Sequence, residues 1–80
     1  MKNSELIKNI IKQCDATDEL ESYYSPKVRK LLRDISLDGL KLAGVLCENY
    51  DKEVSWQNTI AVKTWFDNVE IMLGILQVYK

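Results

Sequence analysis

The chain has 80 residues, a net charge of -1 and no histidine, and these features restrict what it can do. A chain of this length is predicted to form one domain over 1–80, which buries only about 60 to 65% of its unfolded surface. The balanced charge provides no long-range attraction toward nucleic acid or anionic lipid. The two cysteines, Cys14 and Cys47, are not in a C-x-x-C arrangement. We therefore predict no metal and no cofactor.

The first residues, MKNSELIKNIIKQ, mix apolar side chains with charged and amide ones, so they lack the continuous apolar core of a secretory signal. The longest apolar run, 69–79, contains Glu70 and Gln77 and is far shorter than the roughly 20 apolar residues that cross a bilayer. We predict a cytoplasmic protein that does not associate with a membrane.

Apolar residues at helical spacing predict an all-α fold, a small three- to four-helix bundle. Ser4 is the candidate N-cap of a first helix that ends near Asp15. Thr17 is the candidate N-cap of a short second segment that carries Leu20, Tyr23 and Tyr24. The apolar face of the first helix consists of Leu6, Ile7, Ile10, Ile11 and Cys14.

Ser25 followed by Pro26 predicts the start of a long central helix, because serine caps free amides and proline at the first position loses no needed donor. Gly39 and Gly44 each cost about 1 kcal/mol relative to alanine, which leaves open a break near residues 36–39. We expect Gly44 to let a neighbouring helix approach closely. The predicted core stripe is Val28, Leu31, Leu32, Ile35, Gly39, Leu42, Leu46 and Tyr50, flanked by a second stripe of Leu37, Leu40, Gly44 and Cys47.

Ser55 is the candidate N-cap of an extensively apolar C-terminal helix from Trp56 to about Tyr79. Its main stripe is Val62, Trp65, Phe66, Val69, Met72, Leu73, Leu76 and Tyr79, and a second face carries Ile60, Ile71, Ile75 and Val78. Roughly 240° of the circumference is apolar, more than a peripheral helix of a small monomer needs. We therefore predict self-association through the second face, in a homodimer or with another protein.

The stretch VKTWFDN, residues 62–68, resembles the DNA-reading helix of homeodomains, with a weaker similarity in LAGVLC at 42–47. The resemblance implies that Trp65 and Phe66 are core residues and that Asn68 contacts adenine. The residues after Asn68, VEIML, supply no cation for phosphates. The interval between the two stretches is also about nine residues longer than the homeodomain turn. We therefore expect Asn68 to be a polar residue of the surface or of an interface.

Four basic residues, Lys27, Arg29, Lys30 and Arg33, cluster in SPKVRKLLRD. Cations in the first turn of a helix oppose its dipole, at a small cost in stability. A function could account for this cost, so the four residues are candidates for binding an acidic partner surface. Intramolecular pairing with the acidic residues of 15–21 is the simpler interpretation. Trp56, Tyr23 and Tyr24 are the other partner-binding candidates, since tryptophan and tyrosine are enriched in contact hot spots.

No arrangement of residues indicates an enzyme. Without histidine, the chain lacks the usual group that titrates near neutrality, and it contains no phosphate-binding or nucleophile motif. The spacing of Asp18 and Glu21 is explained by the start of a helix. We expect too little interior volume for a site of about 300 Å³ or more, and hence no small-molecule substrate. The prediction is a non-catalytic protein–protein interaction module, such as a small adaptor, an immunity or antitoxin protein, or a phage-type inhibitor. The alternative is a nucleic-acid-associated accessory protein that uses the basic cluster.

Overall fold

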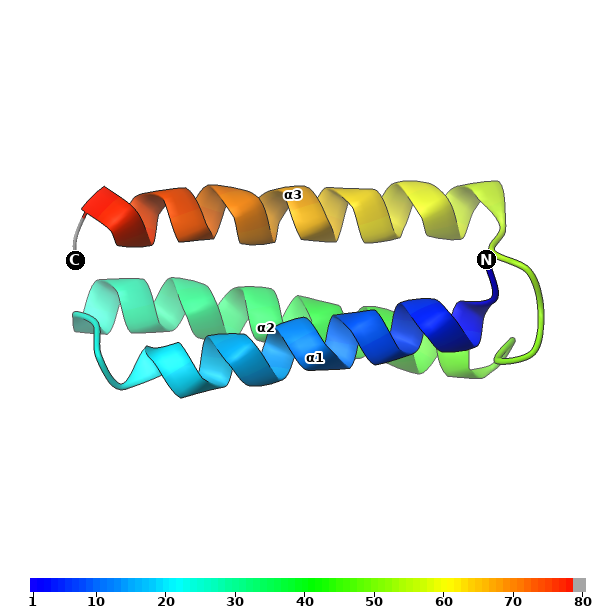
Figure 1. Ribbon diagram of the computed structural model, residues 1–80, viewed down its shortest axis with the longest axis horizontal. Coiled ribbons are helices and arrows are strands. Elements are labelled where there is room, and N and C mark those ends of the chain that lie inside the picture. The colour runs from blue at the N-terminus through cyan, green and yellow to red at the C-terminus, as the bar shows by residue number, and fades with distance from the viewer. Residues whose placement is uncertain (79–80) are drawn as a thin grey trace.

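The structure, a computed structural model, describes residues 1–78 and contains three helices. They are α1 (Asn3–Glu21), α2 (Pro26–Cys47) and α3 (Trp56–Val78). The helices lie side by side along the longest, 40 Å dimension of the molecule (Figure 1). The all-α prediction is confirmed, and the described residues form no strand beyond an isolated bridge between Lys2 and Glu53. Within this part of the chain, each helix is too short or too polar to cross a bilayer.

Helix α1 runs without interruption through the region where the sequence predicted an end near Asp15 and a new start at Thr17. That prediction was wrong. Thr17 is buried, and its hydroxyl donates to the carbonyl oxygen of Gln13 in the preceding turn. A hydroxyl that is bonded back along its own helix does not cap a new one. Continuation of the helix also places Thr17 on the same face as Ile10 and Cys14. The N-cap residue is Lys2 and not Ser4.

Met1 and the first residue of α1 are hydrogen-bonded to the loop between α2 and α3. The amide of Asn3 donates to the carbonyl oxygen of Lys52 at 3.0 Å, and the amide of Val54 donates to that of Met1 at 3.1 Å. The buried side chain of Asn3 donates from Nδ2 to the carbonyl oxygen of Asn49 at 2.7 Å. The loop thus accepts bonds from the first amides of α1, which have no partner inside the helix.

Helices α2 and α3 begin where the sequence predicted. Pro26 is the first residue of α2, but the hydroxyl of the N-cap residue Ser25 makes no capping bond. In α3, the amide of Asn58 donates to Oγ of Ser55 at 3.2 Å, which is the predicted cap. Helix α2 is continuous, so the break considered near 36–39 does not occur. The predicted end of α3 near Tyr79 lies outside the described residues.

Two clusters of buried side chains hold the helices together. The first joins all three helices around Ile10, Leu46 and Trp65. The second joins α2 to α3 through Val28, Leu32, Met72 and Leu76, and Leu20 and Tyr24 pack against it. Helix α2 packs on both of its neighbours, whereas α1 and α3 approach each other less closely.

Helix α3 approaches α2 closely at Gly39. The indole of Trp65 lies over this glycine and donates from Nε1 to the carbonyl oxygen of Ile35 at 2.8 Å. A Cβ atom at Gly39 would lie 2.5 Å from Cε2 of Trp65. Close approach was predicted at Gly44, and that prediction was wrong: apart from the adjacent residues and the backbone of its own helix, no described atom lies within 4 Å of a Cβ placed there. The glycine of the core stripe, not the glycine of the second stripe, receives the neighbouring helix.

The predicted core stripes are too wide at their edges. Trp65 is buried and Phe66 packs against the first cluster, as the sequence predicted. Four residues assigned to core stripes are exposed, because three helices cover only the centre of each apolar face. They are Ile11, Leu31, Tyr50 and Leu73. Tyr79, also assigned to a core stripe, lies outside the described residues.

Candidate interaction surfaces

The outward side of α3 carries three exposed apolar side chains, which we call the α3 outer face: Trp56, Ile60 and Ile71. Their exposed fractions are 77%, 46% and 63%. Ile60 and Ile71 belong to the predicted self-association set, and the described structure leaves both uncovered. Ile75 is half-buried and lines a cavity of about 290 Å³ with Val28 and Leu31 of α2. Ile75, which the sequence assigned to the contact between copies, thus lies partly against α2 of its own chain. The side chain of Val78 lies outside the described part of the structure.

Polar residues interrupt the α3 outer face. Lys63, Thr64 and Asp67 are exposed and lie one or two helical turns from Ile60 and Ile71 on the same side of α3. The hydroxyl of Thr64 donates to the carbonyl oxygen of Ile60 at 3.0 Å. The α3 outer face is therefore two separate apolar spots with a charged centre, not a continuous strip.

A second uncovered strip runs along α2. It contains the predicted second stripe, of which Leu37 and Leu40 are 48% and 49% exposed. Cys47 is exposed as a free thiol, and the space over Gly44 is open. We define the α2 seam as six exposed residues: Lys30, Arg33, Leu37, Leu40, Gly44 and Cys47. The apolar part of this seam is continuous, unlike that of α3.

The two tyrosines at the turn between α1 and α2 have different surroundings. Tyr23 is 80% exposed, whereas Tyr24 is half-buried against the cluster of Val28 and Leu32. Adjacent side chains leave the backbone in different directions, so the core covers only one of them. Of the predicted partner-binding aromatics, Trp56 and Tyr23 are free to contact another molecule.

The four basic residues differ in their exposure and in their contacts. Lys27 and Lys30 are exposed, and Arg29 is half-buried. Nη2 of Arg33 donates to Oε1 of Glu21 at 2.7 Å, an ion pair at the surface. This hydrogen bond, with the charge of Glu21, raises the pKa of the Arg33 guanidinium. The expected intramolecular pairing is thus observed for one of the four cations, while Asp15, Asp18 and Glu19 of the same acidic segment are exposed.

One cleft is larger than the sequence led us to expect. It has a volume of about 560 Å³ and lies between the start of α1, the loop before α3 and the start of α3. Leu6, Val54, Val62 and Phe66 form its apolar lining. Lys63 and Glu53 contribute charge at its edge, and Oε2 of Glu53 pairs with the amino group of Met1 at 3.2 Å. We expected too little volume in the interior for a small-molecule site. This cleft does not test that expectation, because it is open at the surface.

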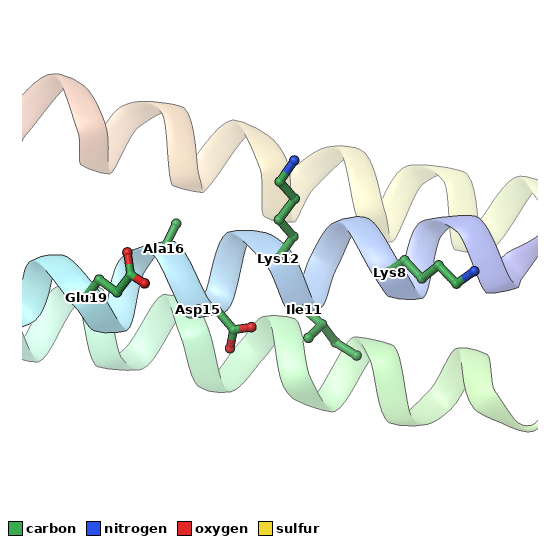
Figure 2. Close-up of a pocket in the computed structure, with 6 residues that line it drawn as sticks. All are labelled: Lys8, Ile11, Lys12, Asp15, Ala16 and Glu19. Atoms are coloured by element: carbon green, nitrogen blue, oxygen red, sulfur yellow. The ribbon is translucent and has the colours of Figure 1, made fainter.

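A shallower hollow of about 480 Å³ follows the outward side of α1. Figure 2 shows its side chains spread to both sides of the helix, with Ile11 and Asp15 toward α2, and Lys12 and Ala16 toward α3. Lys8 and Glu19 complete the lining. Two cations, two carboxylates and one isoleucine on a convex helix provide no converging donors, so this hollow has no features of a binding site.

The titratable groups form no arrangement suited to catalysis or metal binding within residues 1–78. The thiol of Cys14 is buried, and its Sγ donates to the carbonyl oxygen of Ser36 at 3.4 Å. Burial raises the pKa of this thiol, and the charges of Asp18 and Asp15 raise it further. In the same span, histidine, cysteine and carboxylate side chains form no group of three that could hold a metal ion.

Comparisons of the chain with protein families, with curated proteins and with solved structures gave no match. The candidate surfaces therefore depend on geometry alone. Sequence reasoning missed the continuity of the α2 seam, which it identified only as a second stripe. The available signal was the spacing of its residues, which alternates between three and four and is the spacing of a helix–helix contact.

Proposed function

We propose that this protein is a non-catalytic protein–protein interaction module that associates with a second copy and presents further apolar side chains to another protein. Small adaptors, immunity or antitoxin proteins and phage-type inhibitors work in this way. In this proposal α2 is the central helix of a small bundle, since both other helices pack on it.

The observation that supports the proposal is the exposure of large apolar side chains on two helices. Trp56 and Ile71 of α3 are 77% and 63% exposed, and Leu37 and Leu40 of α2 form part of a continuous apolar strip. Single exposed apolar residues are normal on a protein surface. Groups that recur along one side of a helix are instead typical of a surface that another chain covers.

Two strips are candidates for the contact between copies. The sequence assigned it to α3 through Ile60, Ile71, Ile75 and Val78. The α2 seam is a second candidate, which the exposure of Leu37, Leu40 and Cys47 supports. The proposed function requires association through at least one of them, whichever it is.

The test is the molar mass in solution. We expect sedimentation velocity of the wild-type chain, from about 1 μM to 1 mM, to show a shift from monomer toward dimer. A chain that remains a monomer throughout this range would refute self-association. The double variant Ile60→Glu/Ile71→Glu tests the α3 assignment, and circular dichroism checks that it retains its helices.

A further inference from the structure

We propose that the α2 seam binds the α2 seam of a second copy in antiparallel orientation, with the twofold axis between residues 40 and 41. This inference depends on the proposed function, because it names the surface through which the module associates with itself. The argument uses the spacing of the exposed residues, the open space at Gly44 and the order of charges along α2.

The α2 seam has the spacing of a helix–helix contact. Its positions, 30, 33, 37, 40, 44 and 47, are separated alternately by three and four residues. Two helices pack along such a seam at a small crossing angle, with each side chain placed between residues of the facing helix. The opposite side of α2 already packs on α1 and α3, so this seam is the side on which another helix can lie. Ile11 of α1, which points toward α2 (Figure 2), is exposed and adds an apolar side chain beside the seam.

Antiparallel pairing about this axis places a leucine opposite a glycine. Leu37 of one copy lies over Gly44 of the other, and Leu40 meets Leu40 of the second copy at the axis. A Cβ atom at Gly44 would have no described atom of another helix within 4 Å. This open position accommodates the leucine that the symmetry brings to it. A glycine in a helix interior costs about 1 kcal/mol relative to alanine, and no contact with another helix within residues 1–78 accounts for Gly44.

The same pairing matches opposite charges. The seam is basic at its start, with Lys30 and Arg33, and acidic just after its end, with Glu48 and Asp51. All four side chains are exposed. In the antiparallel dimer, Lys30 of one copy faces Asp51 of the other. Arg33, which is paired with Glu21 in its own chain, faces Glu48. Parallel pairing would place like charges together at both ends, which is unfavourable.

The α3 outer face lacks a continuous apolar strip. An antiparallel pairing centred midway between Ile60 and Ile71 places Thr64 opposite Asp67 and Lys63 opposite Asn68 of the second copy, so polar side chains meet at its axis. The interruption by Lys63 and Thr64 also leaves no continuous apolar seam. We therefore assign the second copy to the α2 seam and leave Trp56 and the α3 outer face to a protein of a different kind.

The dimer should be weak, because one pair of helices buries less surface than the roughly 1,200 Å² of a stable interface. The experiment is sedimentation velocity on the full chain from about 1 μM to 1 mM. Leu40→Glu should raise the dissociation constant by about tenfold or more, because it places two carboxylates at the axis. Its circular dichroism should match that of the wild type, since Leu40 is exposed.

Gly44→Ala provides the sharper test. The methyl group enters open space within one chain but occupies the position of Leu37 of the second copy. The variant should therefore keep or gain helix stability while its dimer weakens. Gly74→Ala is the matched control, because Gly74 is also a helical glycine with open space around it but lies outside the α2 seam. Its dissociation constant should equal that of the wild type.

Charge reversal tests the orientation. Lys30→Glu and Asp51→Lys should each weaken the dimer, because residues 30 and 51 of different copies face each other, and the double variant should restore it. Oxidation provides a second readout. Leu40→Cys in a Cys47→Ser background should form a covalent dimer at the axis, where the two Cα atoms can approach within the roughly 7 Å that a disulfide requires. In the antiparallel arrangement, Cys47 of one copy lies far from Cys47 of the other, so the wild-type protein should not form a disulfide between copies.

The outcomes separate this inference from the proposed function. If Ile60→Glu/Ile71→Glu abolishes the dimer while Leu40→Glu and Gly44→Ala leave it unchanged, the α2 seam is wrong and the proposed self-association stands. A ready Cys47 disulfide between copies would overturn the antiparallel orientation. A monomer at every concentration would overturn both proposals.

Discussion

The thiol of Cys14 on α1 donates to the backbone carbonyl of Ser36 on α2, with 3.4 Å between Sγ and the oxygen. Cys14 is buried and Cys47 is exposed, so the two thiols should react at very different rates. We expect a disulfide reagent to modify Cys47 rapidly in the folded protein, and Cys14 only after the protein unfolds. Cys47→Ser should remove the fast reaction. A fast reaction that persists in this variant would show that α1 and α2 separate readily.

The same burial links the Cys14 thiol to stability at high pH. The folded protein holds the thiol proton more tightly, because burial raises the pKa above its ordinary value of 9.0. The stability that this provides is complete below pH 9 and is lost as the pH rises through the folded-state pKa. We expect the urea midpoint to fall above pH 9, and to fall less steeply in Cys14→Ala. Cys47→Ser should follow the wild-type curve, and equal slopes for all three proteins would contradict the prediction.

Gly39→Ala should destabilise the protein although alanine favours a helix. The added Cβ atom would lie 2.5 Å from Cε2 of Trp65, so the indole must move and weaken its bond to the carbonyl of Ile35. We expect a net loss of about 1 to 3 kcal/mol in the free energy of unfolding, measured with urea. Gly74→Ala is the control and should gain up to about 1 kcal/mol. Equal increases in the free energy of unfolding for both variants would show that Trp65 of α3 does not pack on Gly39.

Leu32→Ala should cost about 2 to 5 kcal/mol, because Leu32 is 1% exposed within the cluster that joins α2 to α3. Leu37→Ala is the control on the same helix, because it deletes the same side-chain atoms at an exposed position. In dilute solution, where the chain is monomeric, it should change stability by no more than about 0.5 kcal/mol. Similar losses at the two positions would mean that the α2 seam is already covered within one chain.

The basic residues of α2 should not bind nucleic acid measurably. Arg33 is paired with Glu21, Arg29 is half-buried, and the net charge is -1. We expect fluorescence anisotropy with a short DNA duplex to show no binding at low salt, where phosphate contacts are strongest. Lys27→Glu/Lys30→Glu is the control. Binding that weakens with added salt and disappears in this variant would favour the nucleic-acid alternative.

Particular residues show how much of this structure could be predicted from the sequence. Ser25, Pro26 and Ser55 marked the starts of α2 and α3 correctly, because turn and cap preferences are local. Thr17 was misread, because the same hydroxyl can cap a helix or bond back within one. The choice depends on whether the residue faces the core, which local sequence does not reveal.

The exposed surfaces depend even more on tertiary arrangement. Periodicity located two apolar stripes on α2 but not which of them a neighbouring helix covers. For that reason Gly44 was expected to receive a helix that in fact lies on Gly39. A glycine within a predicted core stripe, as Gly39 was, is the better indication of close approach, since every neighbouring position in that stripe carries a side chain.

The missing side chain at Gly39 also fixes the position of α3 along the axis of α2, because the indole of Trp65 packs there. A slide of one turn, about 5.4 Å, would bring the indole of Trp65 over Ile35 or Ala43, whose side chains occupy the space that it needs. No second glycine lies on this side of α2 to offer an alternative seat. The two helices therefore have a single axial register, and the α3 outer face is held at a fixed height relative to the α2 seam.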